Sequence, residues 1–132
     1  MIKNKKDNRP LIVRLWEYQW ERVPVLIVTV IAAISVGVVY KFSDTSLSHY
    51  LVAVAILVLY MIQIRTADEK KDFDHDNEFR KDRPVQRGLV SLEELQKVTY
   101  VVMVSQIVLY ASFLDARIFL LGLASRLRVS NA

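Results

Sequence analysis

The stretch that decides the fold is LSHYLVAVAILVLYMIQIRTADEKKDFDHD, residues 47–76. Its first eighteen residues contain no Lys, Arg, Asp or Glu, whereas residues 68–76 are mostly charged. An uncharged run of this length is close to the roughly 20 residues that a helix needs to cross the hydrocarbon core of a bilayer. The stretch therefore predicts a membrane helix that ends in an acidic motif at the water interface.

Two further uncharged runs, residues 23–40 and 98–114, have similar lengths. The helices of a soluble bundle usually carry a polar stripe, and the run 25–39 carries none. We therefore expect an all-α, polytopic transmembrane helical bundle. Three full spans are predicted, at about 23–41, 47–66 and 96–114. A fourth span, 116–132, begins and is incomplete, so we expect the chain to be the N-terminal part of a longer protein.

The basic residues predict how such a bundle is oriented. Of the 18 Lys and Arg residues, six precede the first span and eight lie between Arg65 and Lys97, whereas the connection 41–46 contains Lys41 alone. By the positive-inside rule, the N-terminus and the segment 67–95 both face the cytoplasm. We therefore expect a multi-pass integral membrane protein. Its basic surface favours the headgroups of the lipid bilayer, and we expect no nucleic acid as partner.

Residues 1–22 are expected to form a basic cytoplasmic tail that leads into an amphipathic interfacial segment. The Trp and Tyr rings between Leu11 and Arg22 are of the kind that lies at headgroup level. Arg22 is expected to extend its side chain to the interface. The membrane domain is then 23–132, with a cytoplasmic loop over 67–95. Ser91 and Glu94 have the spacing of a capping box, which predicts that a helix starts there.

The acidic motif places Asp68, Asp72 and Asp76 four residues apart, on one face if the helix continues. Like charges at this spacing repel by roughly a few tenths of a kcal/mol per pair, so a cation is expected to receive them. Mg²⁺ prefers oxygen ligands and usually binds through one or two carboxylates together with substrate phosphates. The pattern predicts a Mg²⁺ site at these three aspartates.

Basic residues follow the acidic motif directly, at Arg80, Lys81 and Arg83. These side chains can bind phosphate oxygens, and Arg does so with two parallel hydrogen bonds. Carboxylates and basic groups interleaved this closely suit a polyanionic ligand that carries its own metal ion. We therefore expect a magnesium–diphosphate site, with the three basic residues in contact with the diphosphate.

Residues 68–76 have three other interpretations. The simplest is a solvated helix end whose acids are balanced by nearby Lys and Arg. An EF-hand calcium loop would have Gly at its sixth position and Glu at its twelfth, where this sequence has Asn77 and Arg83. The CDP-alcohol phosphotransferase pattern requires an Asp-Gly-x-x-Ala-Arg element, which the sequence lacks.

Residues 68–91 resemble the first aspartate-rich signature of the UbiA-type intramembrane prenyltransferases. That signature runs Asn-Asp-x-x-Asp-x-x-x-Asp and continues through Arg-Pro and a Gly to the next helix. The matching residues here are Asp68, Glu69, Asp72, Asp76, Arg83, Pro84 and Gly88, with Asp68 in place of Asn and Glu69 in place of the first Asp.

The resemblance implies Mg²⁺-dependent transfer of a prenyl group from a prenyl diphosphate to a hydrophobic acceptor, aromatic or lipid-like, within the membrane. It also implies that Asp72 and Asp76 hold Mg²⁺ and that Arg83 contacts the diphosphate. Family enzymes carry a second aspartate-rich motif, and nothing after Asp115 resembles it. These residues alone are therefore expected to be inactive. The alternative is a non-catalytic membrane protein whose acidic loop binds a divalent cation, lipid headgroups or a partner.

Overall fold

The computed structural model describes residues 7–113, and over that range the chain is helical without any strand. The helices are α1 (Leu11–Arg22), α2 (Val25–Tyr40), α3 (Leu47–Lys71), α4 (Phe73–Phe79) and α5 (Leu92–Phe113). The all-α prediction is therefore confirmed for this part of the chain. The incomplete span predicted at 116–132 lies outside the described residues.

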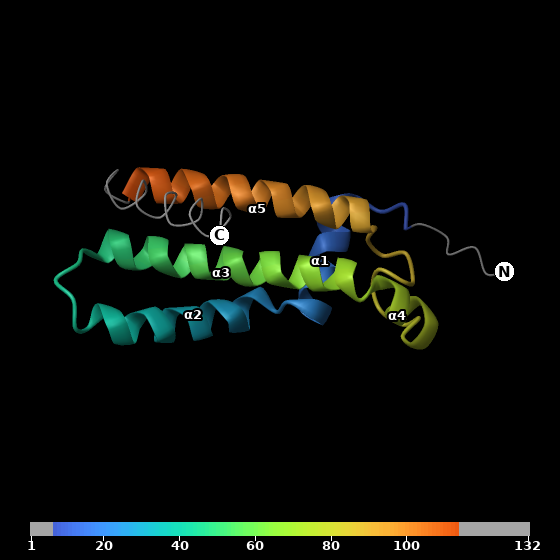
Figure 1. Ribbon diagram of the computed structural model, residues 1–132, viewed down its shortest axis with the longest axis horizontal. Coiled ribbons are helices and arrows are strands. Elements are labelled where there is room, and N and C mark those ends of the chain that lie inside the picture. Colours follow the sequence, from blue (N-terminus) through green and yellow to red (C-terminus); the bar gives the residue numbers. More distant parts are fainter. Residues whose placement is uncertain (1–6, 114–132) are drawn as a thin grey trace, which may run out of the picture.

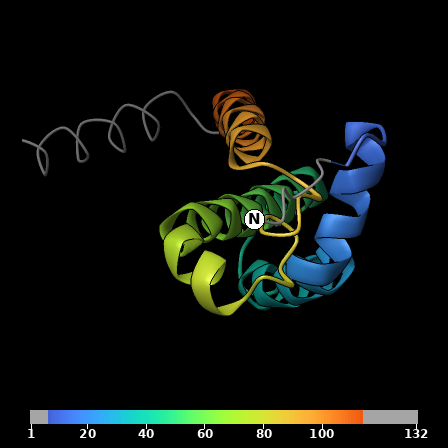
Figure 2. The same cartoon turned by 90° about the vertical axis from the view of Figure 1, so that its right-hand side faces the viewer.

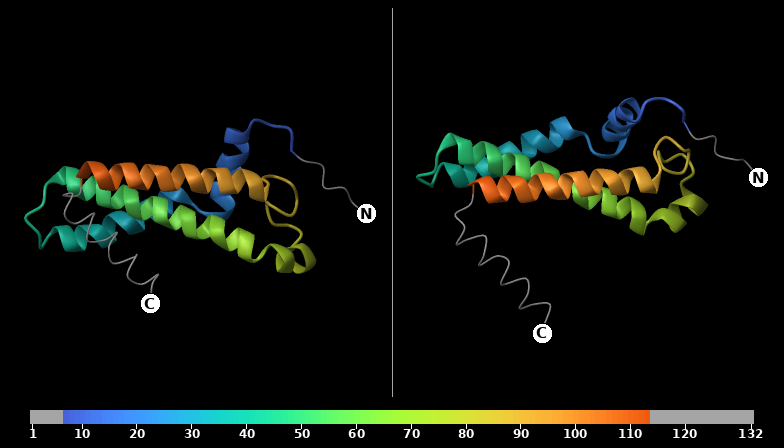
Figure 3. Two further views of the ribbon diagram at one scale, coloured as in Figure 1. Left: turned by 45° about the horizontal axis from the view of Figure 1, so that its top comes forward. Right: turned by 90° about the horizontal axis from the view of Figure 1, so that it is seen from above.

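The three long helices α2, α3 and α5 lie side by side, with α3 in contact with both others (Figure 1, Figure 3). The Tyr50 hydroxyl on α3 donates to the carbonyl oxygen of Ala33 on α2 at 2.9 Å. The hydroxyls of Thr66 and Thr99 join α3 to α5 at 2.8 Å. The connection 41–46 lies at one end of this bundle, and α4 lies at the other, which we call the charged end (Figure 1).

Among the described residues, α3 is the helix that is long and apolar enough to cross a membrane by itself. Only 6% of the most apolar 18-residue stretch of α3 is buried, whereas the core helix of a soluble protein would be mostly buried. Helices α1 and α2 are long and apolar enough to cross a membrane only when they are taken together as one segment. That segment is bent by 59° between the two helices. The bend falls at Val23, because a residue before a proline disfavours helical dihedral angles.

The predicted loop 67–95 contains more helix than the sequence indicated. Helix α3 continues to Lys71, and α4 follows after a single residue, Asp72, whose dihedral angles are φ −90° and ψ 2°. The backbone N–H of Asp72 still donates to the oxygen of Asp68, and that of Asp76 to the oxygen of Asp72, each at 2.9 Å. The i to i+4 spacing of the three aspartates therefore survives the break, and the irregular part is reduced to 80–91.

The predicted start of the last described helix is confirmed. The backbone N–H of Ser91 donates to the Glu94 carboxylate at 3.0 Å, and the N–H of Glu94 donates to the Ser91 hydroxyl at 3.1 Å. These two reciprocal bonds form a capping box, which satisfies two N–H groups that would otherwise lack partners. Helix α5 begins one residue after Ser91, at Leu92.

A small apolar core lies at the charged end of the bundle. Its buried members are Tyr18, Val85, Leu89, Val90 and Leu95. The turn that brings these residues together requires Gly88, whose φ of 84° lies in the left-handed region that a side chain disfavours. The long helices, in contrast, expose large apolar side chains along most of their length.

Helix α1 runs across the direction of the long helices (Figure 2) and has two different faces. Arg14 and Tyr18 are buried on the inner face, each with 5% exposure. Ile12, Trp16 and Trp20 are exposed on the outer face. Of the aromatic rings expected at headgroup level, the two Trp rings are thus free to lie there, whereas Tyr18 packs into the core beside Val85 and Leu89.

Candidate functional site

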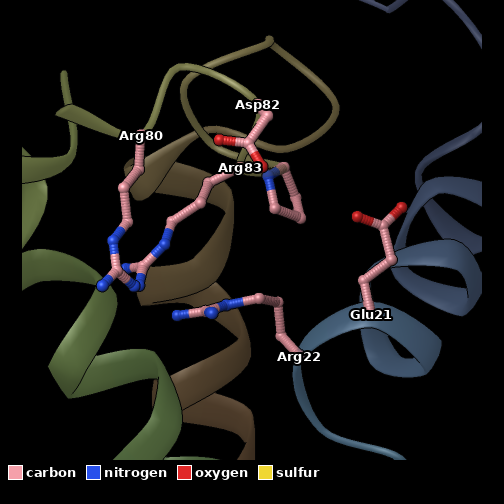
Figure 4. A pocket seen from close by; sticks show the side chains of 6 residues that line it. Glu21, Arg22, Arg80, Asp82 and Arg83 are labelled. Atoms are coloured by element: carbon pink, nitrogen blue, oxygen red, sulfur yellow. The ribbon is translucent and has the colours of Figure 1, made fainter.

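A pocket of about 440 Å³ opens at the charged end of the bundle, and we call it the arginine pocket. Its lining consists of Glu21, Arg22, Arg80, Asp82, Arg83 and Pro84. These residues come from two places, the end of α1 and the segment that follows α4. Figure 4 shows the guanidinium groups of the three arginines gathered on one side, with Glu21 on the other. Positive charge therefore converges on one small region.

Arg83 is held in the pocket wall by Asp76. The Arg83 guanidinium donates to the Oδ2 atom of Asp76, whose side chain is only 2% exposed, while that of Arg83 is 14% exposed. The position of Asp76 is fixed in turn by the helical bond from its N–H to Asp72. Two residues predicted separately, as a metal ligand and as a diphosphate ligand, therefore form one buried ion pair.

Arg22 is held by Glu69, a residue of α3. The Nε of Arg22 donates to the Oε1 of Glu69 at 2.5 Å, and the Glu69 side chain has no exposed surface. Arg22 therefore does not extend to the interface as expected. The other carboxylate oxygen of Glu69 is also buried, and the Glu69 carboxylate interacts with the buried Tyr18 hydroxyl. Burial, followed by the nearby charge of Glu69, raises the pKa of Tyr18 well above its usual value.

Arg80 is the pocket arginine without an ion pair among the described residues, and it is exposed. Its backbone N–H donates to the oxygen of Asp76 at 2.9 Å, so Arg80 continues the row of Asp68, Asp72 and Asp76 by one more helical step. Lys81, which the sequence also predicts as a diphosphate ligand, is exposed and is not among the residues that line the pocket.

The three predicted metal ligands have different surroundings. Asp68 is half-exposed, and its Oδ2 atom lies 3.9 Å from a terminal guanidinium nitrogen of Arg65. Asp72 is exposed without an ion pair among the described residues. Asp76 is buried against Arg83. Within residues 7–113, no group of three or more His, Cys, Asp or Glu side chains could hold a metal ion. One or two carboxylates suffice for Mg²⁺ when phosphates complete its shell, so Asp68 and Asp72 fit that role.

Two further ion pairs among the described residues, one buried and one exposed, tie α1 to the charged end. The Arg14 guanidinium donates to both carboxylate oxygens of Glu94 at 2.9 Å and to the carbonyl oxygen of Leu89 at 3.0 Å. The Arg87 guanidinium donates to both carboxylate oxygens of Glu21, at 2.8 and 2.5 Å. These contacts fix α1 beside the pocket and thereby place Arg22 within it.

Acid is expected to loosen α1 from the charged end. The hydrogen bond from Arg87 lowers the pKa of Glu21 below its ordinary value of 4.5. A carboxyl group with a lowered folded-state pKa stabilises the fold above its ordinary pKa, and this stabilisation is lost as the pH falls through the lowered value. Trp16 and Trp20 are the two tryptophans of the chain, so their emission should change below about pH 4.5.

The substitution Glu21→Gln is the control for this acid response. It removes the titrating group and should reduce the amplitude of the change in tryptophan emission. An acid response of unchanged size in the variant would show that the Glu21–Arg87 pair does not cause it.

No known family model matches this sequence, and no curated protein or solved structure is significantly similar to it. The function must therefore be inferred from the residues themselves. The sequence predicted six site residues, and all six lie at the charged end, although Lys81 does not line the pocket; they are Asp68, Asp72, Asp76, Arg80, Lys81 and Arg83. It did not identify the Arg22–Glu69 pair, because the two residues are 47 positions apart and no local spacing links them.

Proposed function

We propose that this chain is the N-terminal part of a membrane enzyme that transfers a prenyl group from a prenyl diphosphate to a hydrophobic acceptor with Mg²⁺. The observation that carries the proposal is the meeting of two features at the charged end. One is the row of Asp68, Asp72 and Asp76 at the end of an apolar helix, and the other is the arginine pocket. The resemblance of residues 68–91 to the UbiA-type signature supports the same assignment.

The proposal includes a membrane location with three spans, formed by α2, α3 and α5. Support comes from the large apolar side chains that these helices expose to their surroundings, since lipid can cover such side chains at no cost. The basic residues of the charged end favour its placement on the cytoplasmic side. Helix α1 would then lie in the interface, with Trp16 and Trp20 at headgroup level.

Prenyl transfer breaks the allylic C–O bond, and the departing diphosphate keeps the electron pair. Arg80 and Arg83 would donate hydrogen bonds to the phosphate oxygens and stabilise the negative charge as it develops. Asp68 and Asp72 would hold Mg²⁺, which supplies further neutralisation of the diphosphate when it is bound. The apolar helices would keep water from the allylic cation, until the acceptor forms the new bond and gives up a proton.

One observation favours a second function. Asp76 and Glu69 both bond to arginines, which leaves fewer carboxylates for a metal ion than the sequence predicts. A non-catalytic membrane protein would fit this arrangement, with a charged end that binds a divalent cation, lipid headgroups or a partner. Such a protein would lack prenyl-transfer activity under every condition, which separates it from the proposed enzyme.

The variant Arg80→Gln tests the proposed diphosphate site. A hydrogen bond to a charged group contributes about 1.5–3 kcal/mol, so the loss of Arg80 should weaken binding of a prenyl diphosphate about 10–100-fold. Titration calorimetry on the full-length product of the reading frame, in detergent with Mg²⁺, measures this affinity.

Lys81→Gln is the matched control, because it removes the same charge from the neighbouring residue, which does not line the pocket. Its affinity should stay within about threefold of the parent protein, as expected for an exposed charge. If Arg80→Gln and Lys81→Gln weaken binding equally, the arginine pocket is not the diphosphate site. If the parent protein binds no prenyl diphosphate, the proposed function is wrong.

A further inference from the structure

Arg22 is the pocket arginine that does not come from the segment after α4. It is the last residue of α1, whereas Arg80 and Arg83 follow α4. Its guanidinium nevertheless points toward the other two and lies on the same side of the pocket (Figure 4). Glu69 and Asp76 pair with Arg22 and Arg83, which allows the three guanidinium groups to lie close together, and Arg80 keeps a positive charge without an ion pair among the described residues.

The way in which Arg22 is bonded leaves most of its hydrogen-bond donors available. A guanidinium has five N–H donors, and Glu69 accepts a bond from the Nε atom alone. The two terminal nitrogens of Arg22 have no hydrogen-bond partner among the described residues. A guanidinium held at Nε is fixed in orientation, while its terminal N–H groups can still donate to phosphate oxygens. The geometry is that of a positioned anion ligand.

Glu69 has the features of a residue that positions Arg22. Its side chain is completely buried, one of its carboxylate oxygens accepts the bond from Arg22, and the carboxylate also interacts with the buried Tyr18 hydroxyl. A buried carboxylate with these two partners is fixed in place and holds Arg22 in one orientation. Because Glu69 contacts Arg22, its negative charge balances a cation that would otherwise be repelled by Arg80 and Arg83.

We infer that Arg22 is a third diphosphate-binding arginine and that Glu69 is its positioning residue, not a metal ligand. The inference rests on the proposed function and deepens it, since it adds a contact from α1 to the same group of guanidiniums. A diphosphate would then be bound between two elements, α1 and the segment after α4. Terminal N–H groups of Arg22 would donate to non-bridging phosphate oxygens.

The double variant Arg22→Met/Glu69→Leu separates this role from a purely structural one. Replacing both members of a buried ion pair with apolar residues is often neutral or stabilising, so thermal unfolding in detergent should stay unchanged or shift upward. The affinity for inorganic pyrophosphate, measured by calorimetry with EDTA present, should fall about 10–100-fold. The full-length product is used, and EDTA removes any contribution from metal ligands.

The double variant Glu93→Gln/Lys97→Gln is the matched control. It also removes one carboxylate and one cation, from an exposed pair of α5 with side chains 79% and 69% exposed. Its pyrophosphate affinity should equal that of the parent protein. A third variant, Arg22→Lys, keeps the charge but loses the planar fork, so its affinity should lie between those of the parent and the Arg22→Met/Glu69→Leu variant.

The outcomes distinguish the inference from the function on which it rests. If the parent protein binds pyrophosphate and Arg22→Met/Glu69→Leu binds it equally well, the inference is overturned while the proposed function stands. Unchanged affinity in Arg22→Lys together with a loss in the double variant would mean that charge alone matters, which overturns the hydrogen-bonding role of Arg22. If the parent protein binds pyrophosphate only with Mg²⁺ and not with EDTA, the inference is overturned while the proposed function stands. If the parent protein binds no pyrophosphate with Mg²⁺ either, the proposed diphosphate site fails and the inference fails with it.

Discussion

Replacing Asp72 with Asn is expected to lower Mg²⁺-dependent prenyl transfer by about 100-fold or more, because a metal ion stabilises the charge of the transition state by several kcal/mol. Asp72 is exposed at the break between α3 and α4. Among the described residues it forms no ion pair, unlike Asp76, whose carboxylate is bonded to Arg83. Asp72 is therefore the carboxylate of the row that is most available to a divalent cation.

The matched control for Asp72→Asn is Asp74→Asn. Asp74 is also exposed, and its substitution removes the same charge two residues away, outside the row of aspartates. A rate assay in proteoliposomes should show less than about a threefold change for this variant. Raising the Mg²⁺ concentration should restore part of the activity of Asp72→Asn, because a higher concentration of Mg²⁺ compensates for its weaker binding to the variant. Equal losses in the two variants would contradict a specific role for Asp72.

The substitution Arg83→Met is expected to destabilise the protein by about 3–5 kcal/mol, the usual effect of removing one partner from a buried ion pair. It would leave the Asp76 carboxylate, which is 2% exposed, without its cation. The second substitution Asp76→Leu, added to Arg83→Met, should recover most of this loss because no unpaired charge then remains. The measurement is the free energy of unfolding in mixed detergent micelles.

An exposed pair provides the comparison for Arg83→Met. Lys97 lies 3.2 Å from Glu93, and both side chains are largely exposed. Lys97→Gln should therefore cost less than about 1 kcal/mol. If Arg83→Met proves as mild as Lys97→Gln, the Asp76–Arg83 pair is not buried in the folded protein as described. The function of the pocket would then have to be argued without it.

The local features of this chain could be predicted from its sequence. Apolar runs bounded by charges gave helices close to those observed, since the predicted spans 23–41 and 47–66 correspond to α2 and α3. The Ser91–Glu94 spacing gave the start of α5, because a capping box involves residues only three positions apart. The four-residue spacing of the aspartates also survives, because helical hydrogen bonds cross the break at Asp72.

The contacts that build the pocket could not be predicted in this way. Arg14 and Glu94 are 80 positions apart, and Arg87 and Glu21 are 66 apart, so no periodicity relates them. The four-residue spacing predicted Asp68, Asp72 and Asp76 as one set of metal ligands, since spacing alone gives them equivalent positions. Burial separates them, because Asp76 faces the inside of the charged end and Asp72 faces outward.

The small apolar core beneath α1 has a consequence for how the two ends of the molecule respond to their surroundings. Tyr18, Leu89 and Leu95 pack against each other within this chain, so the order of that end comes from its own side chains. The long helices are joined by few hydrogen bonds among the described residues, and many of their large apolar side chains are exposed to the surrounding medium. Amide hydrogen exchange near Leu89 should therefore depend little on lipid, while the helix–helix contacts around Tyr50 should open when lipid is exchanged for a harsher detergent.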